Sequence, residues 1–231
     1  AGFSPCPADP MTPCGVLPLG DSITEGFGSS GGGYRVELFR RAIAGGKNIT
    51  FVGTLQNGPN EVDGKPFPRK HEGHGGYTID TDSGHSGISG QITSQALATG
   101  AHIVLLMIGT NDINGNVDVN NAPTRLGKLI DDITMRAPNA LVVVATIIPI
   151  ANNQGANQKV MAYNGKLPEL VNMRAAAGKH VVLLDNYGLF AANPNYASAW
   201  MGDNLHPNNT GYAELGKAFY GAIESALPAA P

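Results

Sequence analysis

The sequence predicts an α/β protein in which helices cover both faces of a parallel sheet, and three observations support this fold class. Five short apolar runs recur along the 231 residues, and the last three are nearly unbroken: HIVLLMI, LVVVATII and VVLL. Continuous runs rich in β-branched residues are typical of strands buried on both faces. Helical patterns separate the runs, which favours a three-layer α/β/α sandwich. Hydrophobic residues make up 42% of the chain, enough for a sizeable core.

The elements follow from these patterns in order along the chain. We expect five strands, at residues 15–19, 49–52, 102–108, 141–148 and 181–184. We expect five helices, at residues 34–43, 88–98, 122–137, 158–177 and 211–226. Pro168 lies inside the fourth helix and predicts a break near residues 165–167, because proline lacks the N–H that a helix needs. Gly178 follows the run RAAA and fits a C-terminal cap.

The whole chain, residues 1–231, is predicted to form one domain. Residues 1–14 form a proline-rich N-terminal extension, in which Cys6 and Cys14 are close enough to favour a disulfide over two free thiols. The chain starts at Ala1 without a leader, so we expect it to have been processed or trimmed. The tail LPAAP at residues 227–231 is either the stub of a linker or a frayed end.

Composition and charge argue against two classes of partner and indicate a compartment. The net charge is −3 and no cluster of Lys and Arg occurs, so nucleic acid is not expected as a partner. No apolar run approaches the ~20 residues of a membrane span. The low charge, the cysteine pair and two sequons indicate a secreted, extracellular glycoprotein. Of the two sequons, we expect Asn48 to carry the glycan, because Asn208 is only two residues from His206.

The segment GDSITEG, residues 20–26, permits two interpretations of Ser22. Residues 22–25 fit a capping box, in which Ser and Glu side chains satisfy the free N–H groups at a helix start. The segment also follows the first predicted strand, and open α/β sheets bind ligands beyond the carboxyl ends of their strands. Ser22 alone favours the cap, so other segments must decide between the two.

Two further polar motifs follow predicted strands. GTND, residues 109–112, comes after the third strand, and DNLHP, residues 203–207, comes after the fifth. Each alone also fits a simple turn. Together with Ser22 they supply the groups of an acyl-transfer site: a hydroxyl nucleophile, His206 as its base, and Asp203 to orient the imidazole. Asn111 adds an amide that can donate to an oxyanion.

The three motifs, in this order, resemble those of the SGNH hydrolases, also called the GDSL family. The family's remaining block contains a glycine, and EGHGGYTI at residues 72–79 matches it, with Gly76 as the corresponding position. The resemblance spans about residues 15–226 and implies a flavodoxin-like α/β/α sandwich with strand order 2-1-3-4-5. It implies that Ser22 both begins a helix and acts as the nucleophile. It also implies an oxyanion hole formed by the N–H groups of Ser22 and Gly76 and the Asn111 amide.

Within that superfamily, HEGHGGYTI and DNLHPN resemble the secreted acetylxylan esterases of carbohydrate esterase family 3. This implies a monomeric serine esterase that removes acetyl groups from an acetylated polysaccharide, such as xylan, through an acetyl-enzyme intermediate and without a required cofactor. Three alternatives remain open: an SGNH esterase or thioesterase for longer acyl chains, a non-catalytic polysaccharide-binding domain, and a nucleotide-binding domain. No phosphate-binding loop withstands inspection, which disfavours the last of these.

Several residues near these motifs are candidates with two roles each. Trp200 can stack on a sugar or pack in the core. Tyr77 and Asn114 can line a substrate cleft or serve as core and turn residues. Asp80 and Asp82 can hold a structural Ca²⁺, although a solvated loop is favoured because two carboxylates are few for such a site. A metal site formed by HEGH at residues 71–74 is disfavoured, because its spacing lacks helical i, i+4 geometry.

Overall fold

The strands predicted from the apolar runs form the centre of the molecule. The computed structural model describes residues 3–82, 84–92 and 96–231. The five strands are β1 (Cys14–Gly20), β2 (Ile49–Phe51), β7 (Ile103–Met107), β8 (Leu141–Ala145) and β9 (Val181–Leu184). Every residue of β1 and β7 is buried, as expected for strands covered on both faces.

Strand β8 ends three residues before its apolar run does. The backbone of Ile147 no longer pairs with a strand, because its N–H donates to Asn164 Oδ1 at 3.0 Å and its carbonyl accepts from Asn164 Nδ2 at 2.9 Å. A side-chain amide therefore replaces the ladder at this point. Apolar content alone cannot reveal such an exchange.

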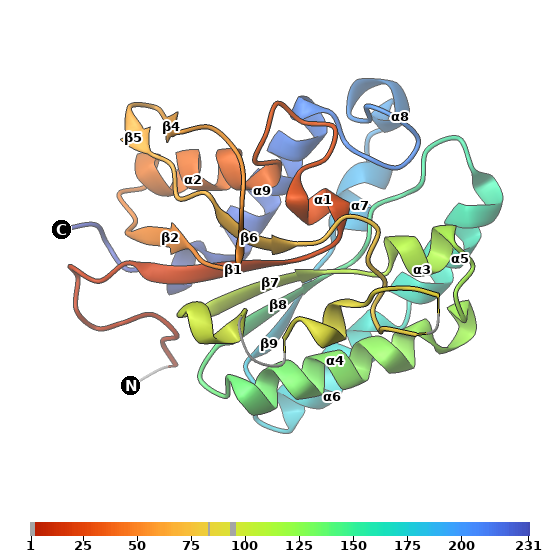
Figure 1. Ribbon diagram of the computed structural model, residues 1–231, viewed down its shortest axis with the longest axis horizontal. Helices are drawn as coiled ribbons and strands as arrows, with labels where there is room; N and C mark the ends of the chain where they lie inside the picture. Colours follow the sequence, from red (N-terminus) through yellow and green to blue (C-terminus); the bar gives the residue numbers. More distant parts are fainter. Residues whose placement is uncertain (1–2, 83, 93–95) are drawn as a thin grey trace.

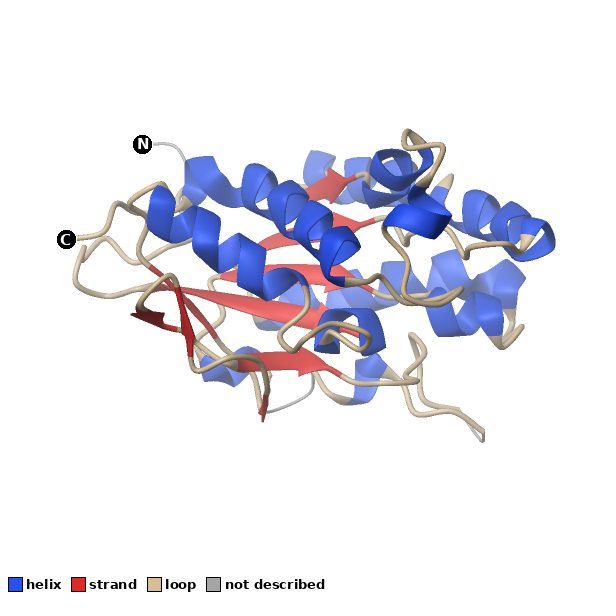
Figure 2. Cartoon of the chain, turned by 90° about the horizontal axis from the view of Figure 1, so that it is seen from above, coloured by secondary structure: helices blue, strands red, loops and turns tan. Residues whose placement is uncertain are grey.

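The sheet is mostly parallel and lies between two layers of helices (Figures 1 and 2). Strand β1 pairs with β7, β7 with β8, and β8 with β9, all in parallel register. On its other edge, the first half of β1 pairs with β2 and its last two residues pair with β6 (Lys70–Gly73). Strand β1 is therefore central, and its carboxyl end is held from both sides.

The irregular segment before residue 90 contains short strands that the sequence did not predict. Within the described residues the main sheet has seven strands, because β6 and β3 (Leu55–Gln56) join the five that were predicted. Strand β3 runs antiparallel to β6, and β4 (Glu61–Val62) and β5 (Lys65–Pro66) form a separate hairpin. These strands are two to four residues long and largely polar, so they carry no apolar period to detect.

Helices cover both faces of the sheet. In Figure 1, α2 (Tyr34–Ala44) and α9 (Asn209–Ile223) lie above the sheet, while α4 (Ala122–Arg136) and α6 (Leu167–Ala176) lie below it. Helix α5 (Gln154–Asn164) ends just before α6 begins, which confirms the break predicted from Pro168. Gly178 adopts φ +83° directly beyond the C-cap residue of α6, as the cap prediction requires.

The helix predicted at residues 88–98 is wrong where it can be tested. The described part contains only the 3₁₀ turns η1 (Ile88–Gly90) and η2 (Leu97–Thr99), and residues 93–95 lie outside the described residues. Glycines at 87 and 90 bracket the first turn, and glycine weakens helical propagation. Further short elements escaped prediction because one turn shows no period: α3 (Thr110–Asn114), η3 (Val119–Asn121), α7 (Asn186–Ala191) and α8 (Tyr196–Ala199). Helix α1 (Ser22–Glu25) begins at Ser22, where a helix start is expected, and η4 (Glu224–Ala226) covers the last residues of the helix predicted at 211–226.

Both ends of the chain contact the start of the sheet. The predicted disulfide between Cys6 and Cys14 is present, with an S–S distance of 2.02 Å. The tail runs along the segment before β2, where Asn48 N donates to Pro228 O at 3.1 Å and Ala230 N donates to Gly46 O at 2.7 Å. Residues 227–231 are therefore docked rather than frayed. Among the described residues, no helix is long and apolar enough to cross a membrane.

Candidate active site

The carboxyl end of β1 leads directly into the short helix that carries Ser22. Asp21 is the N-cap of α1, because its Oδ1 accepts a hydrogen bond from Ile23 N at 2.9 Å. Ser22 is the first helical residue and is 9% exposed. The capping-box interpretation is therefore wrong in its assignment: the cap is Asp21, one residue earlier. The Ser22 hydroxyl is left free for another partner.

That partner is His206. Ser22 Oγ lies 2.9 Å from His206 Nε2, and His206 Nδ1 lies 2.9 Å from Asp203 Oδ2. The other carboxylate oxygen, Asp203 Oδ1, accepts from the backbone N–H groups of Leu205 and His206 at 2.7 and 2.6 Å. These bonds close a tight turn that fixes the carboxylate against the imidazole. The arrangement fits a hydroxyl activated by a base that a third group orients.

The environment of Asp203 favours its charged form. Partial burial raises the pKa of this carboxyl, but hydrogen bonds from the His206 side chain and from two backbone N–H groups outweigh burial and hold the pKa below its ordinary value. Asp203 therefore stays ionised at neutral pH. An ionised partner at Nδ1 keeps a proton on that nitrogen and leaves Nε2 free to accept the proton of Ser22.

The carboxyl end of β7 supplies Asn111. Gly109 is the N-cap of α3 and has φ +123°. A Cβ there would lie 2.8 Å from the Tyr163 ring, so this turn requires glycine. Asn111 Nδ2 donates one hydrogen to Tyr77 O at 2.8 Å. The second hydrogen of that amide remains for a ligand. The bond to Tyr77 also ties α3 to the loop that carries Gly76.

The predicted oxyanion groups and the Ser–His pair share one pocket of about 300 Å³. Its lining consists of Ser22, Glu25, Phe27, Gly75, Gly76, Asn111, Leu205 and His206. Gly76 adopts φ +79°, which favours glycine. A Cβ on Gly75 would lie 2.9 Å from Glu25 Oε2 and 4.0 Å from Ser22 Cβ, so a side chain there would fill the pocket.

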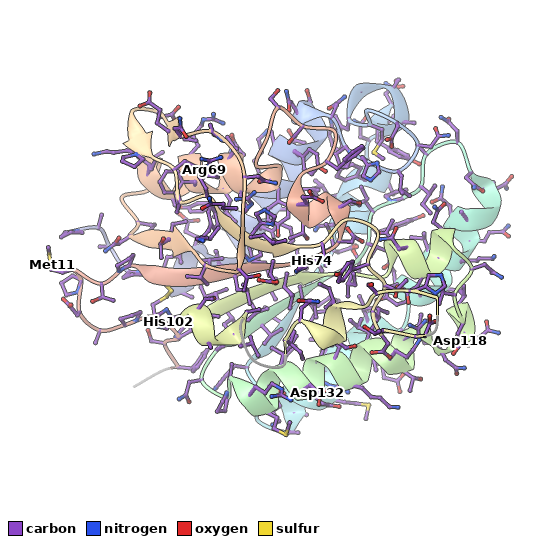
Figure 3. All side chains as sticks on the ribbon, viewed as in Figure 1. Met11, Arg69, His74, His102, Asp118 and Asp132 are labelled. Atoms are coloured by element: carbon purple, nitrogen blue, oxygen red, sulfur yellow. A yellow bond between two sulfur atoms is a disulfide. The ribbon has the colours of Figure 1, made fainter. Side chains whose placement is uncertain are left out.

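A buried pair of side chains supports the loop of Gly75 and Gly76. Glu72 is 1% exposed, accepts from Thr54 N at 2.8 Å and lies 2.6 Å from His74 Nε2. Burial raises the pKa of Glu72, but hydrogen bonds from His74 and Thr54 outweigh it and lower the pKa overall. The ring of His74, labelled in Figure 3, stacks on Tyr77 with centroids 4.7 Å apart. No group of three possible metal-binding side chains occurs within the described ranges.

The predicted substrate-contact residues lie elsewhere or act through the backbone. Trp200 packs edge-on against Phe190, with ring centroids 5.2 Å apart, and does not line the Ser22 pocket. Asn114 lines a separate hollow beside α5. Tyr77 contributes its carbonyl to Asn111 and its ring to His74. Trp200 therefore has a packing contact in the structure and lies outside the lining of the Ser22 pocket.

The loop and sequon residues also have local partners. Asp82 Oδ1 accepts from Gly84 N at 2.8 Å and from His85 N at 2.9 Å, whereas no contact of the Asp80 side chain joins it to Asp82 among the described residues. Asn48 Nδ2 donates to Pro10 O at 2.8 Å. Asn208 caps α9 by accepting from Gly211 N at 3.0 Å. The side chain of Asn208 is thus committed to the fold.

Sequence reasoning assigned no ligand contact to four residues of the pocket wall, of which Gly75 and Leu205 adjoin predicted site residues in sequence and Glu25 and Phe27 do not. Both lie within six residues of Ser22, but no feature of their type or spacing marks them as ligand contacts. Phe27 is 57% exposed, and its ring centroid lies 4.6 Å from that of His206. Proximity in sequence to the GDS segment is the only signal that would have pointed to them.

Comparison with known proteins finds related sequences and structures. The pattern of the GDSL-like Lipase/Acylhydrolase family matches residues 19–214. The structure of a Clostridium thermocellum family 3 carbohydrate esterase is 31% identical, with a TM-score of 0.76 over 93% of this chain and 98% of that one. A carbohydrate esterase family 3 structure from Talaromyces cellulolyticus is 24% identical, with a TM-score of 0.73 over 92% and 97% of the chains, and shares the fold.

A curated multidomain esterase of Ruminococcus flavefaciens is 30% identical over 237 residues. The match covers 93% of this chain but only 29% of that protein, so the chain spans less than a third of the relative's length. Together these matches confirm the resemblance that the four sequence blocks predict.

Proposed function

Because the chain belongs to the GDSL-like lipase/acylhydrolase family and is an esterase of that family, we propose that it removes acetyl groups from an acetylated polysaccharide, with xylan as the first candidate. The observation that carries the proposal is the continuous chain of contacts from Ser22 Oγ through His206 to Asp203, with 2.9 Å at each step. The similarity to family 3 carbohydrate esterases supports the choice of substrate class.

The reaction begins when Ser22 Oγ attacks the ester carbon and His206 Nε2 takes the hydroxyl proton. The carbonyl oxygen becomes an oxyanion, which accepts hydrogen bonds from the N–H groups of Ser22 and Gly76 and from the Asn111 amide. Donors fixed in advance stabilise this charge without reorganising, and each is worth roughly 2.7–4 kcal/mol of the barrier. His206 then protonates the leaving sugar oxygen as the C–O bond breaks.

The second half of the reaction repeats these roles with water. His206 takes a proton from water, the resulting hydroxide attacks the acetyl-enzyme, and the proton returns to Ser22 Oγ as acetate leaves. Asp203 holds the imidazole in the required tautomer throughout. The proposed steps use side chains and backbone N–H groups of this chain together with water. The disulfide supports a proposal that the protein works outside the cell as a secreted enzyme.

The test is acetate release from acetylated xylan, measured beside hydrolysis of p-nitrophenyl acetate, butyrate and octanoate. We compare the wild type with Ser22→Ala and with Ser198→Ala, an exposed serine outside the pocket. The proposal expects acetate release, preference for the acetate ester, and loss of activity only in Ser22→Ala. Preference for octanoate would instead support the longer-chain acylhydrolase. Full activity of Ser22→Ala would refute the site itself.

A further inference from the structure

Phe27 is held rigidly by its backbone while its ring stays exposed. Phe27 N donates to Ser22 O at 3.0 Å, and Phe27 O accepts from the buried Tyr212 Oη at 2.6 Å. The flanking Gly26 and Gly28 adopt φ +97° and +84°, so both sides of the turn require glycine. The backbone of Phe27 is thus held in place by hydrogen bonds, whereas 57% of the residue is exposed to solvent.

The position of this ring, rather than its exposure, calls for an explanation. Single exposed hydrophobic residues are ordinary on protein surfaces. Phe27, however, lines the Ser22 pocket, and its ring lies 4.6 Å from the His206 ring at an angle of 55°. Because more than half of the residue is exposed, the side chain is accessible to a ligand in the pocket. Leu205, the residue before His206, adds a second apolar side chain to the wall of this pocket.

The chemistry of the site decides which part of a substrate meets Phe27. The oxyanion must face the N–H of Gly76 and the Asn111 amide. The leaving oxygen must face His206 Nε2, because that nitrogen delivers its proton. Phe27 contacts the His206 ring, so it borders the leaving group rather than the acyl group. An ester of a sugar therefore places the sugar ring, not the acetyl methyl, beside Phe27.

We propose that Phe27 is the platform on which the sugar ring of the leaving group stacks, which makes it a specificity-determining residue for the alcohol half of the substrate. The inference rests on the proposed function. The face of a pyranose carries C–H groups that pack on an aromatic ring, and ligand pockets join such apolar walls to a few placed polar groups. Because the backbone of Phe27 is already fixed, little conformational entropy is lost when the sugar binds.

The test compares two acetate esters that differ only in the alcohol: an acetylated xylo-oligosaccharide and ethylene glycol monoacetate, which has no ring. Phe27→Leu removes the ring but keeps apolar volume beside His206, and Phe27→Tyr keeps the ring. Phe3→Leu changes another exposed aromatic, on the N-terminal extension, as a control. We expect Phe27→Leu to raise KM for the oligosaccharide. The ratio of kcat/KM for the oligosaccharide to kcat/KM for the glycol ester should fall about tenfold. Phe27→Tyr should keep this ratio at the wild-type value.

Each outcome separates the platform from other roles. If Phe27→Leu lowers both kcat/KM values equally, or moves the acid limb of the pH profile, then Phe27 only positions His206 and the proposal is overturned. An unchanged ratio with an active wild type also overturns it, while leaving the proposed function intact. If the wild type releases no acetate from the oligosaccharide but hydrolyses the glycol ester, the proposed function fails and this inference fails with it.

Discussion

Replacing Asp21 with asparagine should stabilise the protein at neutral pH. Asp21 is 1% exposed, its Oδ1 caps α1, and its Oδ2 has no hydrogen-bond partner within the described residues. Burial, together with the nearby charge of Asp112, raises the pKa of this carboxyl to about 7, against the opposing bond from Ile23 N–H. Asparagine has the same shape, keeps the Oδ1 acceptor for the cap, and is neutral at every pH.

The sign and size of the effect follow from linkage. The folded protein keeps a proton on Asp21 up to pH about 7, whereas the unfolded chain releases it near pH 3.9. The stability from this group is therefore full below pH ~4 and is lost as the pH rises towards 7. The gap between the two values corresponds to roughly 4 kcal/mol as an upper limit. Asparagine removes this pH-dependent loss.

Urea unfolding at several pH values measures the free energy of unfolding of both proteins. We expect the advantage of Asp21→Asn over the wild type to grow by about 3 kcal/mol between about pH 4.5 and about pH 8. Asp132→Asn, an exposed position labelled on α4 in Figure 3, is the control and should show no such growth. An advantage of Asp21→Asn that stays constant with pH would refute the reasoning, since Asp21 would then be ionised in the folded protein.

Three further predictions concern catalysis and the disulfide. Asn111→Ala should lower kcat by about 10²–10³-fold with little change in KM, because one oxyanion donor is lost, as steady-state kinetics will show. Asp203→Asn should lower kcat by about 10²–10⁴-fold while circular dichroism stays unchanged, since the imidazole loses the partner that sets its tautomer. Cys6→Ser with Cys14→Ser should lower the free energy of unfolding by about 2–3 kcal/mol in urea, by releasing a short loop, without loss of activity. Equal stability with and without the disulfide would contradict the last.

The sequence predicts the central strands well because their signal is local. A run such as VVLL at residues 181–184 is apolar whatever surrounds it, and it forms β9 as expected. The strands at Leu55–Gln56 and Lys70–Gly73 have no such local signal, because only their pairing with each other and with the sheet makes them strands. The end of β8 depends on Asn164, which is seventeen residues from Ile147 in sequence. Tertiary partners of this kind leave no trace in periodicity.

The sequence likewise predicts some parts of the candidate site and not others. The blocks around Ser22 and Asn111 directly follow β1 and β7, so topology brings them to one edge of the sheet. The block of His206 comes after β9 only beyond α7 and α8, so its place does not follow from the end of that strand. Trp200 is close to His206 in sequence but faces Phe190, because its direction is set by packing. Phe27 reaches the pocket only because a turn between two positive-φ glycines folds it back over His206. The order of strands and motifs thus predicts which segments meet but not which side chains face the ligand.

Hydrogen bonds to other segments hold the site together, although the elements that carry it are short. Helix α1 has four residues and α3 has five, and isolated helices of this length are not stable in water. Polar bonds to other segments hold these parts instead: Asn111 of α3 donates to the Tyr77 carbonyl, and Tyr212 donates to the carbonyl of Phe27, two residues beyond the end of α1. Such bonds fix the donors and the nucleophile before a substrate arrives, which is the condition under which oxyanion donors lower a barrier. Breaking one of these ties should therefore lower kcat even though the lost bond touches no substrate atom.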